Sequence, residues 1–266
     1  MAEVVRLAAS LDGPPGAPVV VLGNSVGTTR ALWQRPASVL RREFRLLRFE
    51  HRGHGTGPAG SETRSPAPPG PYTIAELGRD VLALLDAEGI DRALYCGISL
   101  GGMIGMWLAA HAPDRIAGLG LVCTSAWLPP AALWTGRAGQ VRADGMGSIA
   151  GQVIGRWFTA AFQAAHPAAV SAYRADFEGI IPEGYAGCCE AISAMDLRPD
   201  LASITAPTLV IAGAEDPATP PWHGARIAAA IAGSRLAVIR GASHLPSASD
   251  PGPVTDALLA QLRATA

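Results

Sequence analysis

Apolar residues follow two alternating patterns along the chain: short continuous runs and longer helical repeats. The continuous runs suit strands buried on both faces of a parallel sheet, and they span residues 17–22, 44–49, 93–98, 116–123, 208–212 and 236–239. Apolar positions three and four residues apart predict helices over residues 29–42, 74–88, 100–110, 222–232 and 253–263. This alternation predicts an α/β fold whose sheet is mostly parallel and doubly wound.

Two segments near the N-terminus have a different character. Residues 3–12 predict one or two short strands, and the turn formers at residues 12–16 predict that the chain enters the sheet through a hairpin. Residues 56–72 are rich in Pro, Gly and Ser, most densely at residues 58–71. Because such a segment cannot hold a regular element, we expect a surface loop there.

The alternation stops between Ser125 and Ala206, where three or four helical segments are predicted instead. Residues 1–125 and 206–266 therefore form the predicted core, and residues 126–205 form an inserted helical lid. The insertion leaves one strand of the sheet and returns to another. We expect it to cover the carboxyl ends of the strands, where ligands enter open α/β sheets.

Composition narrows the classes of partner. A length of 266 residues fits one α/β domain with an inserted subdomain. The net charge is −1 and no basic run or acidic tail occurs, so a small-molecule substrate is favoured over nucleic acid or a membrane surface. The four cysteines lack metal-ligand spacing and indicate reduced thiols, and we expect neither a metal nor another cofactor.

The sequence says less about the location and the oligomeric state of the protein. The N-terminus lacks the pattern of a secretory signal, and no apolar stretch approaches the roughly 18 residues of a membrane span. We therefore expect a cytoplasmic protein. The sequence does not predict an oligomeric state.

The apolar run at residues 93–98 is followed by a candidate catalytic motif. It continues as Gly97-Ile98-Ser99-Leu100-Gly101, a G-x-S-x-G sequence between a predicted strand and a predicted helix. This context is that of a nucleophile elbow, a sharp turn that holds a serine in a strained conformation at the exposed end of a strand. Side chains at positions 97 and 101 would collide with neighbouring backbone, so glycine is needed there. Ser99 is the predicted nucleophile.

A serine nucleophile needs a base, and the base needs an acid that orients it. In the α/β-hydrolase arrangement the chain order is Ser, acid, His, and the acid and the His each follow a later strand. The run at 208–212 leads to Asp216 and the run at 236–239 leads to His244. Glu215 is adjacent but would point elsewhere. We predict a triad of Ser99, Asp216 and His244.

The turn after the first buried run supplies a further part of the predicted site. An oxyanion hole takes one backbone N–H from the residue after the nucleophile and one from this earlier turn, which here are Leu100 and Ser25. The glycines of the turn do not have dinucleotide-binding spacing, so Glu50 is interpreted as a buried or loop-anchoring carboxylate. The histidines other than His244 are interpreted as solvated or satisfied side chains, although His51 and His54 could line the pocket.

Almost the whole chain resembles one family of α/β-hydrolases, the 3-oxoadipate enol-lactone hydrolases of bacterial aromatic catabolism. The chain departs from the family at Phe49-Glu50, where Tyr-Asp is usual, and in its longer Pro-rich segment. The matching stretches are residues 22–29, 52–55, 97–103, 156–159 (Arg-Trp-Phe-Thr), 184–189 (Gly-Tyr-Ala-Gly-Cys-Cys), 206–213 and 216–221 (Asp-Pro-Ala-Thr-Pro-Pro).

The resemblance implies an α/β-hydrolase fold and a reaction of the β-ketoadipate pathway. Ser99 would open the enol-lactone through an acyl-enzyme, and water would then release 3-oxoadipate. This substrate carries a free carboxylate, so a cation is expected in the lid or at the mouth of the pocket. Trp134 and Arg137, three residues apart on one helical face, are the first candidates, and Arg156 is the second.

Alternatives remain open at this point. Trp134 could be lid core and Arg137 a solvated charge. A general carboxylesterase or a cofactor-free haloperoxidase-like hydrolase would share the triad and differ only in the pocket. A non-catalytic ligand receptor of the same fold is a remote alternative.

Overall fold

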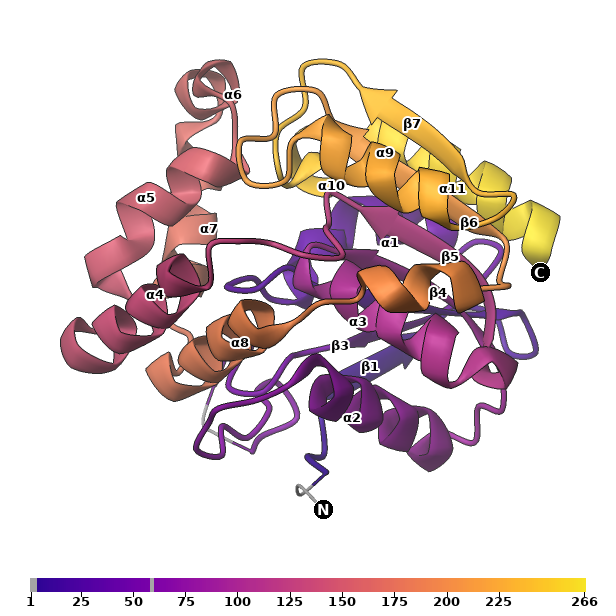
Figure 1. The fold of residues 1–266 in the computed structure, drawn as a ribbon, viewed down its shortest axis with the longest axis horizontal. Coiled ribbons are helices and arrows are strands. Elements are labelled where there is room, and N and C mark those ends of the chain that lie inside the picture. Colours follow the sequence, from indigo (N-terminus) through magenta and orange to yellow (C-terminus); the bar gives the residue numbers. More distant parts are fainter. Residues whose placement is uncertain (1–3, 58–59) are drawn as a thin grey trace.

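The computed structural model describes residues 4–57 and 60–266. Residue 3 of the predicted 3–12 segment and residues 58 and 59 of the Pro-rich segment lie outside these ranges. Within them, seven strands form one sheet in the order β1-β3-β2-β4-β5-β6-β7 (Figure 1). All neighbours are parallel except β1 and β3. The strands are β1 (Ala9–Asp12), β2 (Val19–Gly23), β3 (Arg45–Phe49), β4 (Ala93–Ile98), β5 (Ile116–Val122), β6 (Thr208–Gly213) and β7 (Arg235–Ile239).

The predicted hairpin at the N-terminus is wrong. β1 pairs antiparallel with β3, with Ala9 opposite Phe49, and so lies on the other side of β3 from β2. The connection runs close over the start of β3, where a Cβ at Gly13 would lie 2.4 Å from the Phe44 carbonyl oxygen. Gly13, at φ +122°, permits this approach, and the turn carries the chain past β3 instead of folding it back.

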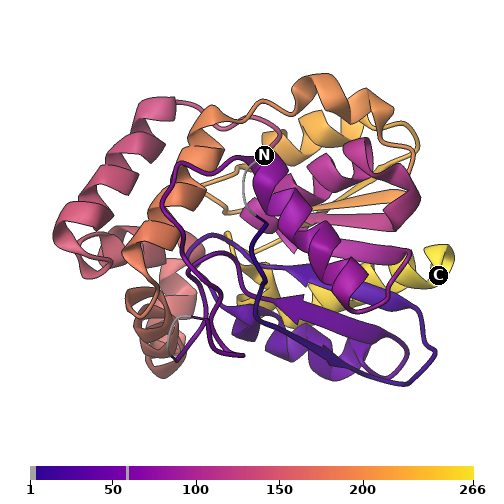
Figure 2. The same ribbon diagram turned by 90° about the horizontal axis from the view of Figure 1, so that it is seen from below.

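Helices cover both faces of the sheet, as Figures 1 and 2 show. One face carries α2 (Ile74–Ala87), α3 (Leu100–His111) and α9 (Pro221–Ala230), and the other carries α1 (Gln34–Leu40), α10 (Pro246–Ser249) and α11 (Pro251–Thr265). α2 begins at a capping box in which Thr73 and Glu76 satisfy each other's backbone N–H groups. The doubly wound α/β fold is confirmed.

The segment between β5 and β6 contains five α-helices, where the sequence predicted three or four segments. They gather on one side of the molecule, at the left of Figure 1. α6 and α7 are separated only by His166, whose backbone breaks the helix just before Pro167, so the two read as one along the sequence. The five helices are α4 (Ala131–Asp144), α5 (Gly147–Trp157), α6 (Ala160–Ala165), α7 (Pro167–Glu178) and α8 (Pro182–Ala194).

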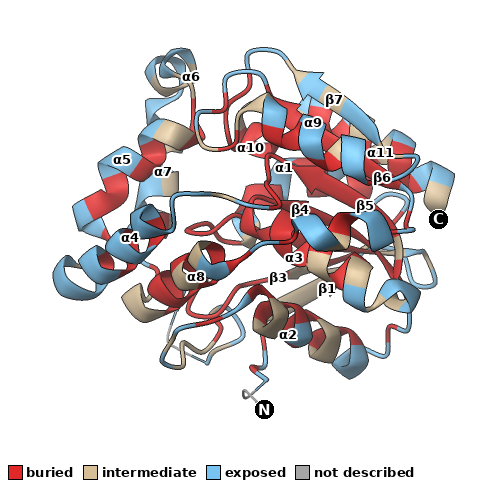
Figure 3. Ribbon diagram, viewed as in Figure 1, coloured by how far each residue is buried: buried red, intermediate tan, exposed pale blue. Residues whose placement is uncertain are grey.

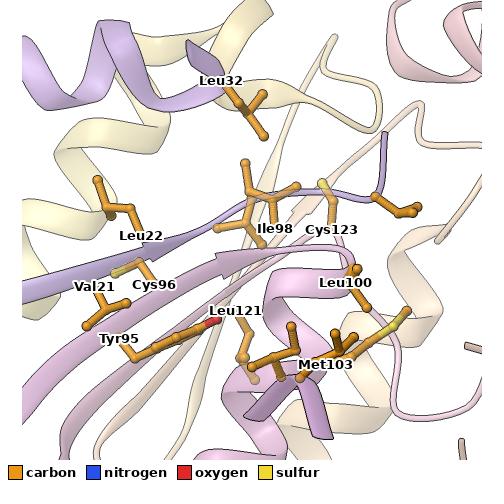
Figure 4. Close-up of a cluster of buried hydrophobic side chains, with 14 of the residues drawn as sticks. Val21, Leu22, Leu32, Tyr95, Cys96, Ile98, Leu100, Met103, Leu121 and Cys123 are labelled. Carbon is orange, nitrogen blue, oxygen red and sulfur yellow. The ribbon is translucent and has the colours of Figure 1, made fainter. Parts of the chain in front are cut away.

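The central strand β4 is buried along its whole length, and the helices expose mainly their outer faces (Figure 3). Figure 4 shows its residue Tyr95 in one buried cluster with Leu22 of β2, Leu121 of β5 and Met103 of α3. The Tyr95 hydroxyl donates to the Gly101 carbonyl at 3.0 Å, which ties β4 to the first turn of α3. The junction between these two elements is therefore anchored in the core.

Two further findings concern the whole described chain. All four cysteines are buried and free. Among residues 4–57 and 60–266, no helix combines the length and the apolar character that crossing a bilayer requires.

Candidate active site

Ser99 lies at the junction of β4 and α3 in a strained backbone conformation, at φ 54° and ψ −114°. A Cβ at Gly97 would lie 2.3 Å from the Gly101 carbonyl carbon, and one at Gly101 would lie 2.4 Å from the Gly23 carbonyl oxygen. The predicted steric need for both glycines is confirmed. Ser99 itself is only 4% exposed, because it lies at the base of a pocket and not on the open surface that the elbow motif suggested.

Asp216 and His244 are brought together by the loops that follow β6 and β7. Asp216 Oδ2 lies 2.8 Å from His244 Nδ1. The other carboxylate oxygen accepts the backbone N–H groups of Ala218 and Thr219, and the Thr219 hydroxyl donates to Oδ2 at 2.6 Å. Burial alone would raise the pKa of Asp216, but the His244 charge and these hydrogen bonds outweigh it and lower the pKa to about 2. Asp216 is therefore an anion at neutral pH.

Ser99 and His244 line the same cavity, which has a volume of about 220 Å³. Within the described part of the chain, no hydrogen bond joins their side chains. Bonds of this kind are often long before a substrate binds and tighten in the complex. The cavity brings the two groups to one reaction space together with Ser25 and residues of the helical insertion.

The backbone N–H groups of Ser25 and Leu100 have no acceptor among the described residues. The turn that holds Ser25 is fixed by its neighbour Asn24, whose carbonyl accepts the Gly101 N–H at 2.9 Å and His51 Nε2–H at 2.8 Å. These bonds hold the turn against the start of α3. Ser25 lines the Ser99 cavity and Leu100 directly follows Ser99, so two N–H groups without a described acceptor are available near the nucleophile, as an oxyanion hole requires.

His51 and His54 form hydrogen bonds with the backbone of this turn and do not line the cavity. His54 Nδ1–H donates to the Arg52 carbonyl, and Nε2 accepts the Gly27 N–H at 3.0 Å. Burial lowers the pKa of His51 to about 4 and that of His54 to about 3. Both are neutral, satisfied side chains, and the suggestion that they could line the pocket is wrong.

The helical insertion contributes two guanidinium groups to the cavity. Arg137, on α4, is buried and lies over the ring of Trp134, with its central carbon 4.7 Å from the ring centroid. One of its terminal nitrogens is 3.4 Å from the Tyr185 hydroxyl, whereas Nε and the other terminal nitrogen are buried without a partner among the described residues. Arg137 is thus not the solvated charge of the alternative interpretation.

Arg156, on α5, lies on the same cavity. Burial, followed by the neighbouring Arg137 charge, lowers its pKa from the ordinary arginine value. The residues that line the cavity include no acidic side chain. Two arginines without an ion pair to any described residue give the cavity a positive charge, which favours an anionic group over a cationic one.

Comparison with known proteins agrees with this geometry. A family model described as the alpha/beta hydrolase fold matches residues 18–251. The chain is 37% identical to 3-oxoadipate enol-lactonase 2 of Acinetobacter baylyi, over 98% of this chain and 95% of that protein. The chain belongs to the enol-lactonase family of α/β-hydrolases.

Solved structures place this α/β-hydrolase in the same group. The enol-lactonase from Burkholderia xenovorans LB400 is 39% identical, with a TM-score of 0.92 over 97% of each chain. A hydrolase from Pseudomonas aeruginosa PA01 is 45% identical, with a TM-score of 0.91 over 97% of this chain and 94% of that one. The protein is an enzyme, a carboxylic ester hydrolase, so the non-catalytic receptor alternative falls away.

Sequence reasoning about this α/β-hydrolase missed two residues of the site. Thr219 donates to Asp216, and Tyr185 contacts Arg137. The spacing Asp216-Pro217-Ala218-Thr219 carries a signal for the first, because an aspartate side chain readily accepts backbone N–H groups two and three residues ahead. No local signal identifies Tyr185, since α8 meets α4 only in the folded chain.

Proposed function

We propose that this hydrolase opens 3-oxoadipate enol-lactone to 3-oxoadipate. The observation that carries the proposal is the buried guanidinium of Arg137, which has two nitrogens without a partner among the described residues and lies on the same cavity as Ser99 and His244. A free carboxylate on the substrate would complete the hydrogen bonding of this group and turn the lactone ring toward Ser99. The names of the related enol-lactonases support the same substrate.

The first half of the reaction forms an acyl-enzyme. Ser99 Oγ attacks the lactone carbonyl while His244 Nε2 accepts the hydroxyl proton, and Asp216 stabilises the resulting imidazolium. The N–H groups of Ser25 and Leu100 hold the negative oxygen of the tetrahedral intermediate. Cleavage of the ring C–O bond expels an enolate that remains attached to the acyl group. It takes the proton from His244 and becomes a ketone, which makes reclosure unfavourable.

The second half releases the product. Water donates a proton to His244 and attacks the acyl carbon, and the second tetrahedral intermediate collapses with return of that proton to Ser99. The products are 3-oxoadipate and free enzyme, with no oxidant or cofactor consumed. We place the reaction in bacterial aromatic catabolism by the β-ketoadipate pathway.

The proposal is tested with 3-oxoadipate enol-lactone, by following the loss of its ultraviolet absorbance. We expect kcat/KM on the lactone to exceed that on a neutral aryl acetate by at least 100-fold, roughly 2.7 kcal/mol of additional transition-state binding. Ser99→Ala abolishes both activities. Equal turnover of the two substrates would instead identify a general carboxylesterase.

Arg137 is tested separately. Arg137→Ala removes the cation, so we expect kcat/KM on the lactone to fall about 100-fold and that on the aryl acetate to change less than threefold. The neutral ester acts as an internal control for folding and for an intact triad. Equal losses on both substrates would show that Arg137 only supports the lid.

A further inference from the structure

A second hollow, of about 290 Å³, lies behind the loop that carries Asp216. It is bounded by the segment that follows β5, by the 3-10 helix Arg198–Ser203 and by the start of α9. None of its lining residues belongs to the Ser99 cavity. The side chains that define it are Trp127, Arg198, Leu201, Trp222, His223 and Arg226.

Two indole rings contribute to its walls, and buried apolar side chains contribute the rest. The Trp222 ring is stacked on His223, with the ring centroids 3.5 Å apart. Trp127 and Trp222 are 39% and 50% exposed, which is unusual for large aromatic side chains. Both lie on the hollow, whereas Leu201 and Ile227 beneath them are buried. Aromatic side chains beside an apolar lining are typical of sites that bind a flat organic molecule.

The charges around the hollow select the sign of the ligand. Arg198 lies over Trp127 but is neutralised by Asp196, at 2.6 and 2.8 Å. Arg226 lies over Trp222, 5.0 Å from the ring centroid, and pairs with no acidic side chain of the described chain. The lining itself contains no acidic residue. Among the residues that line the hollow, Arg226 is thus the one cation without an ion-pair partner in the described chain, and the Asp216 charge reaches the hollow only through His223.

The same hollow contains a fixed polar group. Ser125 Oγ donates to the Trp127 carbonyl and lies 2.7 Å from His223 Nδ1, so Nδ1–H is the donor in that bond. His223 Nε2 has no partner within the described residues. The ring is therefore held in one orientation by its far side while its other nitrogen remains available to a ligand or a water.

From this arrangement we propose that the hollow is a second ligand site, which binds a small aromatic monocarboxylate. The ring of the ligand packs on the apolar lining beside Trp127 and Trp222, and its carboxylate pairs with Arg226. The segment 125–129 and the stretch 216–223, which runs from the Asp216 loop into the first turn of α9, each contribute residues to this hollow and to the Ser99 cavity. A ligand in the hollow would therefore contact the segment that carries Asp216 without entering the active site.

The test uses benzoate as the probe, with fluorine NMR of protein labelled with 5-fluorotryptophan. The six tryptophans give separate reporters, assigned by Trp→Phe variants. Trp127 and Trp222 report on the proposed site, and Trp134 and Trp157 report on the Ser99 cavity. We expect saturable shifts at Trp127 and Trp222, and at least tenfold weaker binding of benzamide, which has the same shape without the charge.

Variants at exposed arginines keep the test independent of folding. Arg226→Gln should weaken the benzoate effect at Trp127 at least tenfold. Arg240→Gln, at an exposed arginine outside the hollow, should leave it within twofold. Shifts confined to Trp134 and Trp157, equal binding of benzamide, or an unchanged response in Arg226→Gln would each overturn the proposal. So would concentration-dependent self-association that Trp222→Ala abolishes, with no benzoate binding.

Discussion

At the scale of single residues, the environment of Asp216 shows how much of this site depends on side chains outside the triad. The carboxylate accepts four hydrogen bonds, from His244, from the Thr219 hydroxyl and from two backbone N–H groups. The first holds the base, and the Thr219 hydroxyl also lies 3.4 Å from His244 Nδ1. The others fix the rotation of the carboxylate, so that one oxygen faces the imidazole.

Thr219→Val tests that role with almost no change of shape. The variant loses the hydroxyl donor, which raises the pKa of Asp216 and leaves the carboxylate freer to rotate. A hydrogen bond to a charged group contributes about 1.5–3 kcal/mol, so we expect kcat/KM on an aryl acetate to fall about tenfold. Thr219→Ser, which keeps the hydroxyl, should retain at least half of the activity. Unchanged kcat/KM in Thr219→Val would show that the backbone donors suffice.

The triad residues could be found from the sequence because each follows a strand, and parallel strands end at one edge of the sheet. Ser99, Asp216 and His244 needed only the strand order and the chain order of the motif, and their catalytic roles stay predictions that the assays above test. The sequence could predict neither the tautomer of His54 nor the lack of partners for two of the Arg137 nitrogens among the described residues. Both depend on atoms supplied by segments distant in the sequence.

At the scale of elements, the insertion is joined to the core by a close contact between α8 and the turn after β3. A Cβ at Gly184 would lie 2.4 Å from the Arg52 carbonyl oxygen and 2.5 Å from Gly53 Cα. Both neighbours are backbone, and Gly53 is itself at φ +71°, so neither can move easily. Gly184 therefore sets the position of α8, and with it the position of Tyr185.

Gly184→Ala should force α8 away from the turn. Overpacking of this kind costs about 1–3 kcal/mol, so we expect a lower free energy of unfolding in urea. We also expect a higher KM for the lactone, because Tyr185 would move relative to Arg137. The matched control is Gly139→Ala on α4, where nothing lies within 4 Å of the new Cβ.

That control has the opposite expected sign. An exposed helical glycine replaced by alanine gains about 0.5–1 kcal/mol in the free energy of unfolding. If both variants were equally stable, the contact between α8 and the turn would be too compliant to position the insertion.

The Pro-rich segment shows which elements could not be predicted in detail. Its composition predicted an irregular loop, and the described part has no helix or strand. The contacts of this segment could be seen only in the folded chain. The Gly53 N–H donates to the Pro66 carbonyl, and the Gly70 N–H donates to the Glu183 carboxylate on α8. The β1 pairing and the helix break at His166 escaped prediction for the same reason, since propensity says nothing about the partner of an element.

At the scale of the whole molecule, three buried ionisable groups near the turn that holds Ser25 make the free energy of unfolding depend on pH. Burial lowers the pKa of His51 and His54 to about 4 and 3, from an ordinary value of 6.5. Burial raises the pKa of Glu50 to about 8, from 4.5. The Arg30 backbone N–H, 3.1 Å from each carboxylate oxygen, and the Arg30 charge, with Nε 3.6 Å away, oppose that rise without cancelling it, and Asp176 adds repulsion.

The two kinds of group act in opposite directions. The unfolded chain binds protons on its histidines up to about pH 6.5 while the folded chain does not, so these histidines make the free energy of unfolding rise with pH up to that point. The folded chain keeps the Glu50 proton up to about pH 8, whereas the unfolded chain releases it near 4.5. Glu50 therefore makes the free energy of unfolding fall as the pH rises between those values.

Between pH 6.5 and 8 the histidine contribution is complete, so the Glu50 contribution stands out. We expect the free energy of unfolding, measured in urea, to fall there by up to about 1.4 kcal/mol per pH unit. Glu50→Gln keeps an oxygen acceptor for the Arg30 N–H but cannot ionise, so subtraction of its curve from that of the wild type isolates the Glu50 contribution. A difference between the two curves that stays flat from pH 5 to 8 would mean that Glu50 is already ionised in the folded protein and that Arg30 outweighs burial.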